Sequence, residues 1–204
     1  SEERLELFKD GVQRAHYLDL VSEESLRPQT ILVFDDGNEY EIKERLGKGE
    51  TTIILRVRPL VLKPGEPAEM ALRIPRSNGR FHPEEKPGAS GFSLEQPFSE
   101  YINYSLSGYR KLAHSELSIP KFYRSSKGQY IASEIISHDF DLRDFLSASK
   151  RISPEDMAEA RIALMEFAVK AGDFSAIADF HLSQMVYDRK NKKWWLLDWT
   201  DATK

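Results

Sequence analysis

The stretch from residue 31 to residue 74 constrains the fold more than any other part of the chain, because it contains four short β-like runs. Apolar and polar residues alternate in the later runs, which is typical of strands that bury one face. The runs are residues 31–34, 39–46, 53–57 and 70–74. They predict an antiparallel, β-rich region in the first part of the chain.

Other segments carry helical patterns. Residues 2–20 place Leu5, Phe8 and Val12 at helical spacing, which predicts a helix that braces the fold or, alternatively, binds a partner. A longer helix is predicted to begin after Ser153 as its N-cap and to end at Gly172. Two further helices are predicted over residues 98–113 and 142–146.

The remaining patterns complete the expected architecture. Strands are predicted over 129–136, 185–187 and 194–197, the last two joined by a polar turn. Residues 75–99 hold four prolines and three glycines and predict an irregular insertion. Strands followed by a long helix predict a two-lobed α+β fold. Its expected parts are a helical extension (1–30), a strand-rich lobe (31–136) and a short helical lobe (137–204).

Composition excludes several classes of protein. The chain has 204 residues, of which 40% are hydrophobic and 30% are charged, which is ordinary for a soluble globular protein. The absence of cysteine excludes disulfides and cysteine-based zinc sites. A net charge of −4 with scattered lysine and arginine gives no nucleic-acid footprint. No apolar run is long enough to cross a membrane, so no membrane insertion is expected.

The polar residues around the last predicted hairpin form the strongest functional pattern. Asp179 and Gln184 precede the hairpin and Asp198 follows it. Because a hairpin brings its two ends together, these three side chains are expected to lie close to one another at its open end. Carboxylate and amide oxygens are suitable ligands for Mg²⁺ beside a phosphate. The alternative is structural, with Asp179 capping a turn and Asp198 ending a strand.

Two features of the strand-rich region fit the same chemistry. Gly47, Lys48 and Gly49 lie between two predicted strands, where glycine permits close approach of a phosphate to the backbone. An ordinary hairpin turn explains the same residues. Ala71 and Arg73 share one face of the strand 70–74, so this face offers a small residue to adenine and a cation to phosphate. A plain amphipathic strand is the alternative.

The ordered spacing of these residues resembles the protein-kinase-like superfamily over residues 40–201. The resemblance implies ATP as the nucleotide, Mg²⁺ or Mn²⁺ as the metal, and a two-lobed kinase fold with a reduced C-terminal lobe. The motif around Asp179 also resembles aminoglycoside phosphotransferases. The resemblance implies these roles: catalytic residues Asp179, Arg73 and Glu100; nucleotide-binding residues Gly47, Lys48, Gly49, Ala71, Arg73, Glu134 and Ile136; metal ligands Gln184 and Asp198.

The chain departs from the family pattern at Arg73, where lysine is expected, and at Gln184, where asparagine is expected. A guanidinium is bulkier than an ammonium and forked, so the first change is not conservative. The leading expectation is an ATP-dependent kinase with a protein substrate, cytoplasmic or secreted to act inside a host cell. The alternatives are a pseudokinase, a small-molecule kinase and, last, a metal-dependent hydrolase using Asp179, His181 and Asp198.

Overall fold

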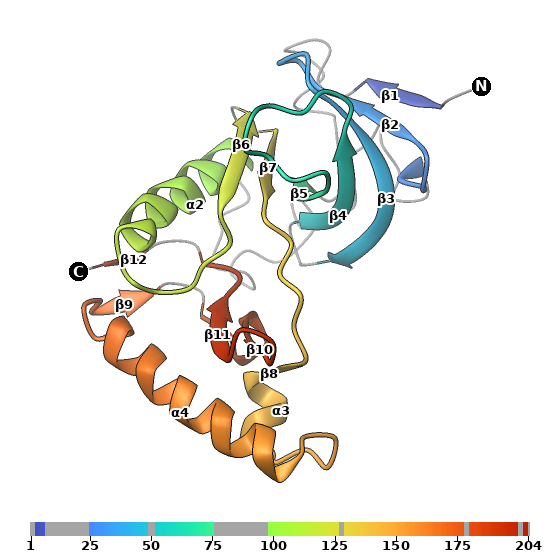
Figure 1. The fold of residues 1–204 in the computed structure, drawn as a ribbon. Helices are drawn as coiled ribbons and strands as arrows, with labels where there is room; N and C mark the ends of the chain where they lie inside the picture. The colour runs from blue at the N-terminus through green and yellow to red at the C-terminus, as the bar shows by residue number, and fades with distance from the viewer. Residues whose placement is uncertain are drawn as a thin grey trace, which may run out of the picture. The chain divides into compact units, whose positions relative to one another are not determined.

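The computed structural model has an α+β fold built on a mostly antiparallel sheet (Figure 1). It describes residues 3–6, 25–48, 52–75, 98–126, 129–177, 180–199 and 202–203. The chain divides into two compact units. The N-terminal unit comprises residues 1–102 and 121–135, and the C-terminal unit comprises residues 103–120 and 136–204.

These units divide the chain differently from the expected boundaries at residues 30 and 136. Residues 4–6, which were expected in a helical extension, pair with the sheet of the N-terminal unit. Residues 103–120 cluster with the C-terminal unit, although they were expected in the strand-rich lobe. The second change of unit follows residue 135.

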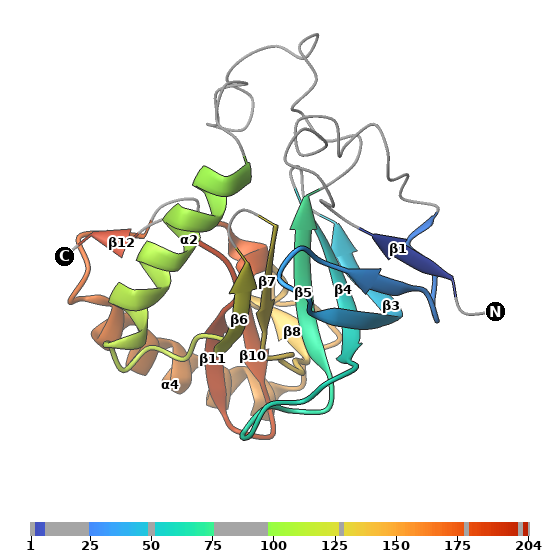
Figure 2. The same cartoon turned by 90° about the horizontal axis from the view of Figure 1, so that it is seen from above.

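The N-terminal unit contains a seven-stranded sheet with the order β1-β2-β3-β4-β5-β7-β6. All neighbouring strands are antiparallel except β1 and β2. Figure 2 shows β7 lying beside β5 on the sheet. The strands are β1 (Arg4–Glu6), β2 (Ile31–Val33), β3 (Glu39–Lys48), β4 (Thr52–Pro59), β5 (Met70–Pro75), β6 (Phe122–Ser126) and β7 (Tyr130–Ser133).

Alternation along the central strands puts one face of this sheet into the core, as predicted. In β5, Met70, Leu72 and Ile74 are fully buried, whereas Ala71 and Arg73 lie on the other face and are half-buried. The inward residues of β3 and β4 join the same cluster. Burying each such side chain contributes roughly 1.5–3 kcal/mol, so the alternation fixes the register of the sheet.

The helix predicted over residues 2–20 is wrong at Arg4–Glu6, which form strand β1. The main-chain oxygen of Glu3 accepts a hydrogen bond from Ile31 N at 2.9 Å, and β1 continues along β2 in parallel register. Leu5 packs against the apolar core of the sheet. The edge of β2 therefore supplies hydrogen-bond partners that outweigh local helical spacing. Residues 7–24 lie outside the described ranges.

The strand predicted over residues 129–136 is shorter in the structure, and β6 was not predicted. Strand β7 ends at Ser133, whose partner Ala71 is the second residue of β5. Because β5 begins at Met70, no β5 residues remain to pair with Ile135 and Ile136. Most of the insertion predicted over 75–99 lies outside the described residues.

The C-terminal unit contains a three-stranded sheet with the order β11-β10-β8 and a two-stranded pair of β12 and β9. Residues 103–113 of helix α2 also belong to this unit. Its elements are α2 (Phe98–Ala113), β8 (Phe140–Asp141), α3 (Leu142–Leu146), α4 (Pro154–Ala171), β9 (Ala176–Ile177), η3 (Leu182–Gln184), β10 (Met185–Asp188), β11 (Lys193–Leu196) and β12 (Ala202–Thr203).

The ends of α4 confirm the predicted caps. The side chain of Ser153 accepts a hydrogen bond from Asp156 N at 3.1 Å, and Pro154 occupies the first turn. Gly172 closes the helix through its N–H, which bonds to the carbonyls of Ala168 and Val169. These bonds satisfy main-chain groups that a helix end leaves without partners. The predicted helices over 98–113 and 142–146 are also confirmed.

Candidate functional site

The hairpin of β10 and β11 brings Gln184 and Asp198 to its open end. Met185 pairs with Leu196, and the N–H of Leu197 donates to the carbonyl of Gln184 at 2.8 Å. Gln184 therefore lies opposite Leu197, and Asp198 is the next residue along the chain. Asp179, the third member of the predicted cluster, lies outside the described residues.

The side chain of Gln184 already makes a local hydrogen bond. Its Oε1 accepts from the N–H of His181 at 2.9 Å, while the N–H of Gln184 donates to the carbonyl of His181 at 2.9 Å. These reciprocal bonds close the short turn η3. An amide oxygen has two lone pairs, so this bond leaves the Gln184 oxygen one further acceptor position.

The carboxylate of Asp198 is held by its own backbone neighbour. Oδ1 of Asp198 accepts a hydrogen bond from Trp199 N at 2.9 Å. The indole Nε1 of Trp199 in turn donates to the carbonyl of Ser105 in α2 at 3.1 Å. Asp198 is half-buried and Trp199 is buried. Trp199 therefore contacts both this carboxylate and α2.

The donor atoms at the open end of the hairpin fit the chemistry of Mg²⁺. Both Gln184 and Asp198 present oxygen, and hard divalent cations prefer oxygen ligands. Across the described part of the chain, no group of three or more histidine, cysteine or acidic side chains could hold a metal ion. The site predicted for this hairpin combines Asp198 with Gln184, which is an amide, and Asp179, which is outside the described ranges.

Gly47 and Lys48 belong to strand β3, which extends two residues beyond its predicted end. Gly47 pairs with Ile54 and Lys48 with Ile53, after an irregularity in register next to Arg45. Among the described residues, a β-carbon on Gly47 would meet Ile54 Cδ1 at 4.0 Å, which is ordinary contact. Crowding by these residues therefore does not demand glycine here. Gly49 lies outside the described residues.

The other expected nucleotide-site residues lie on β5 and after β7. Arg73 pairs with Ile54 of β4 and Ile131 of β7, so it occupies the middle of the sheet. The N–H of Glu134 donates to the carbonyl of Lys121 at 2.8 Å, and its Oε1 accepts from Lys121 N at 3.2 Å. Ile136 is half-buried, and the second segment of the C-terminal unit begins with it.

Glu100, the expected partner of Arg73, lies in α2, but its side chain is outside what the structure describes, as is that of Lys48. The expected set thus falls into two groups by unit. Gly47 on β3 and Ala71 and Arg73 on β5 lie in the sheet of the N-terminal unit, with β4 between these two strands. Gln184 and Asp198 lie at one hairpin end of the C-terminal unit.

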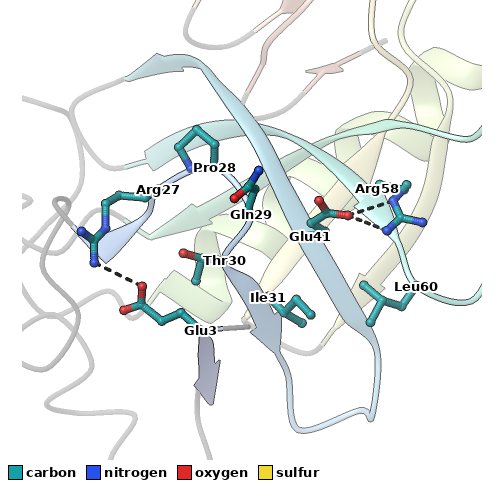
Figure 3. Close-up of a pocket in the computed structure, with 9 residues that line it drawn as sticks. All are labelled: Glu3, Arg27, Pro28, Gln29, Thr30, Ile31, Glu41, Arg58 and Leu60. Carbon is teal, nitrogen blue, oxygen red and sulfur yellow. Dashed lines mark hydrogen bonds and ion pairs between the residues drawn. The ribbon is translucent and has the colours of Figure 1, made fainter. Parts of the chain in front are cut away.

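Sequence reasoning missed a pocket of about 680 Å³ in the N-terminal unit (Figure 3). Two ion pairs line it: Arg27 Nη2 lies 3.1 Å from Glu3, and Arg58 Nε donates to Glu41 at 2.9 Å. The bonds that Lys43 and Arg58 donate hold the pKa of the Glu41 carboxyl below its usual range. The residues that line the pocket are Glu3, Arg27, Pro28, Gln29, Thr30, Ile31, Glu41, Arg58 and Leu60.

This pocket contains no residue of the expected site. Its two arginines are each paired with a glutamate, so their charges offset one another and select neither an anion nor a cation. No motif in the sequence marks these residues, because single charged side chains on strands are common on protein surfaces.

Sequence reasoning also missed a buried polar network around Arg124 and Tyr130. The phenol of Tyr130 donates to the Asp36 carboxylate and accepts from Tyr40 at 3.0 Å and from Asn38 at 3.0 Å. Burial raises the pKa of the Tyr130 phenol, and its bonds to Asp36 and Tyr40 add to the shift. These groups satisfy one another within the fold, so we read the network as structural.

No model of a protein family matches the chain. A search of curated proteins likewise finds no significant match. The geometry of the site and the sequence pattern are therefore the basis for a functional proposal. Within the described ranges, no helix has the length and apolar character needed to cross a membrane.

Proposed function

We propose that this chain is an ATP-dependent phosphotransferase with a protein-kinase-like, two-lobed fold and a reduced C-terminal lobe. The observation that carries the proposal is the hairpin bond between Leu197 N and the Gln184 carbonyl. That bond brings together, at one hairpin end, the amide of Gln184 and the carboxylate of Asp198, which follow Asp179 by five and nineteen positions in the sequence. Phosphoryl transfer needs few other covalent groups, because positioning and charge stabilisation supply most of the catalysis.

Each residue has a distinct role in the proposal. Asp179 orients the acceptor hydroxyl and takes its proton. Mg²⁺ or Mn²⁺, when bound, neutralises charge on the phosphates. Arg73 binds phosphate oxygens, and Glu100 orients Arg73. The residues proposed to hold the metal are Gln184 and Asp198, and those proposed to surround the nucleotide are Gly47, Lys48, Gly49, Ala71, Glu134 and Ile136.

The glycine at position 47 supports the proposal independently of the hairpin. Among the described residues, a β-carbon there would make only an ordinary contact with Ile54 Cδ1 at 4.0 Å, so these residues do not require glycine for steric reasons. Glycine does allow a phosphate to approach the backbone closely. Only about 45 residues separate Glu134 from Asp179 in the sequence, which is short for an insertion that forms a small-molecule pocket. We therefore propose a protein hydroxyl as the acceptor, over an aminoglycoside-like one.

A pseudokinase is the second candidate, and one observation favours it. Oε1 of Gln184 already accepts a hydrogen bond from His181 N, so its capacity as a ligand is reduced. The arginine at position 73 also favours a pseudokinase, because a guanidinium binds phosphate in a forked geometry that lysine does not share. Such a protein binds nucleotide without transferring its phosphate.

Incubation with γ-labelled ATP and Mg²⁺ tests the leading proposal. We expect wild-type protein to label itself or an added protein, and Asp198→Ala to abolish labelling. Asp173→Ala is the matched control, because Asp173 is an exposed acid in the turn after α4. Labelling that survives Asp198→Ala contradicts the proposal.

A thermal-shift titration separates the two candidates. Stabilisation by ATP with Mn²⁺ but no labelling indicates the pseudokinase, since a ligand that binds only the folded state raises its stability. Neither stabilisation nor labelling rejects both candidates. Labelling of a small alcohol but of no protein assigns the enzyme to small-molecule kinases.

A further inference from the structure

Two buried tryptophans of the C-terminal unit donate indole hydrogen bonds to main-chain carbonyls of helices. Trp194 Nε1 donates to the carbonyl of Ala160 in α4 at 2.8 Å. Trp199 Nε1 donates to the carbonyl of Ser105 in α2 at 3.1 Å. The two side chains are equally buried, at 1% and 2% exposure. The pair therefore offers two similar anchors, of which only one adjoins a candidate metal ligand.

Trp199 donates hydrogen bonds both to the carboxylate of Asp198 and to helix α2. Its main-chain N–H donates to Oδ1 of Asp198 at 2.9 Å. Its ring stacks on that of Tyr109, one helical turn after Ser105, with centroids 6.4 Å apart and planes 16° apart. The indole is therefore fixed in both direction and tilt by α2, and the amide that holds Asp198 belongs to the same residue.

The chain leading to Trp199 is also fixed by main-chain bonds. Leu196 N donates to the carbonyl of Ser118 at 3.0 Å, and Leu197 N donates to the carbonyl of Gln184 at 2.8 Å. Further along the chain, the bond from the Trp199 indole to α2 holds the residue whose main-chain N–H donates to the Asp198 carboxylate.

We propose that Trp199 is a positioning residue for Asp198, so that the affinity of the hairpin for a divalent cation depends on the hold of α2 on the indole. This inference rests on the proposed function, because it takes Asp198 as a metal ligand. Groups that orient a metal ligand from outside the coordination sphere commonly change metal affinity by about 10–100-fold when removed.

The test is the affinity of the protein for Mn²⁺, measured from the electron paramagnetic resonance signal of free Mn²⁺ without ATP, because ATP itself chelates the ion. Trp199→Phe keeps an aromatic ring beside Tyr109 and removes the indole N–H. We expect this variant to bind Mn²⁺ about tenfold more weakly than wild type. Trp194→Phe removes the other indole bond and is expected to bind Mn²⁺ as wild type does.

The tryptophan control separates positioning from general loss of stability. Each variant loses one buried hydrogen bond and part of a buried ring, so both should lower the melting temperature, by at least about 2–4 °C. A merely structural role predicts that Mn²⁺ affinity falls equally in both variants or in neither. Either result overturns the proposal. Ser105→Ala is a second control with wild-type affinity expected, since the acceptor on residue 105 belongs to the main chain.

Two further variants keep the outcome decisive. If Trp199→Phe does not fold, Tyr109→Leu is the substitute, because it removes the ring that stacks on the Trp199 indole. Tyr109 is half-buried, and we expect this variant to lose less Mn²⁺ affinity. Unchanged affinity in Tyr109→Leu then overturns the proposal. Asp198→Ala distinguishes the two levels of inference. If it binds Mn²⁺ as wild type does, the proposed function fails at this hairpin, and the positioning role fails with it. If Asp198→Ala loses Mn²⁺ while Trp199→Phe does not, only the positioning role fails.

Discussion

Arg124 and Glu66 form a two-pronged ion pair inside the N-terminal unit, with only 4% and 7% of their side chains exposed. Arg124 Nε donates to Glu66 Oε1 at 2.7 Å, and its Nη2 donates to the second carboxylate oxygen. The guanidinium also donates to the carbonyl of Val61 at 2.7 Å and to Asn38 Oδ1 at 3.0 Å. This pair ties the loop between β4 and β5 to strand β6.

We expect Glu66→Ala to destabilise the protein strongly, because it leaves the buried guanidinium of Arg124 without its charge partner. Breaking one side of a buried ion pair costs about 3–5 kcal/mol. Urea denaturation measures the change in the free energy of unfolding. Glu3→Ala is the control, since the pair of Glu3 with Arg27 is largely exposed and is worth about 0–1 kcal/mol. Equal losses in the free energy of unfolding would show that the buried ion pair stabilises the protein no more than the exposed pair does.

The same pair predicts a loss of stability in acid. The bond from Arg124 holds the pKa of the Glu66 carboxyl below its ordinary value of 4.5. The unfolded chain therefore takes up this proton more readily than the folded one as the pH falls. The contribution of Glu66 is complete above pH 4.5 and is lost as the pH falls through the lower folded value.

The acid dependence is measured from urea midpoints between pH 7 and pH 3. Other acids with lowered pKa values, including Asp156 and Glu41, also weaken the fold at low pH, so the comparison with Glu66→Gln isolates the Glu66 part. We expect the stability of Glu66→Gln to fall less steeply below pH 4.5 than that of wild type. Parallel curves for the two proteins would refute this assignment.

Ser153→Ala should shorten or loosen the start of α4, because it removes the acceptor of the Asp156 N–H. Loss of an N-cap of this kind costs about 1 kcal/mol. Ser153→Asp keeps an acceptor at the same position and should stay within about 0.5 kcal/mol of wild type. Thermal unfolding followed by circular dichroism measures both. A cost in the aspartate variant equal to that in the alanine variant would contradict the cap.

Arg73→Ala tests the cation of the proposed site. Arg73 lies on the sheet face opposite the fully buried residues of β5, so we expect the variant to fold. Loss of a charge that stabilises the reacting phosphate should lower kcat/KM for Mg·ATP by about 10²–10³-fold. Arg56→Ala is the matched control, because Arg56 pairs opposite Ala71 and therefore shares this face. Equal activity of the two variants would remove Arg73 from the mechanism.

Helix ends and alternating strands could be predicted because their causes are local. Ser153 and Gly172 mark α4 through bonds to residues within four positions. The alternation of Met70 with Ala71 is likewise visible within five residues, and the structure confirms it. Side-chain periodicity of this kind reports burial directly.

Pairings between distant segments could not be predicted in the same way. Leu5 has helical spacing with Phe8, yet it lies in a strand whose partner is more than twenty residues away. Arg124 is polar in a run without alternation, and only the position of Glu66 explains its burial. The sequence predicted that Gln184 and Asp198 share a hairpin end, because one turn connects them, whereas the anchoring of Trp199 on Ser105 depends on tertiary packing.

The pairing of β5 with β7 has a consequence for how the N-terminal unit assembles. Strands β2 to β5 form successive local pairs, whereas Ala71 in β5 meets Ser133 in β7 across about sixty residues of chain. Closing so long a loop costs entropy before its contacts repay it, so this joint should form after the meander. We therefore expect the ion pair of Arg124 and Glu66 to form late, on the native side of the folding barrier. Its loss should shorten the lifetime of the folded state and leave the refolding rate nearly unchanged.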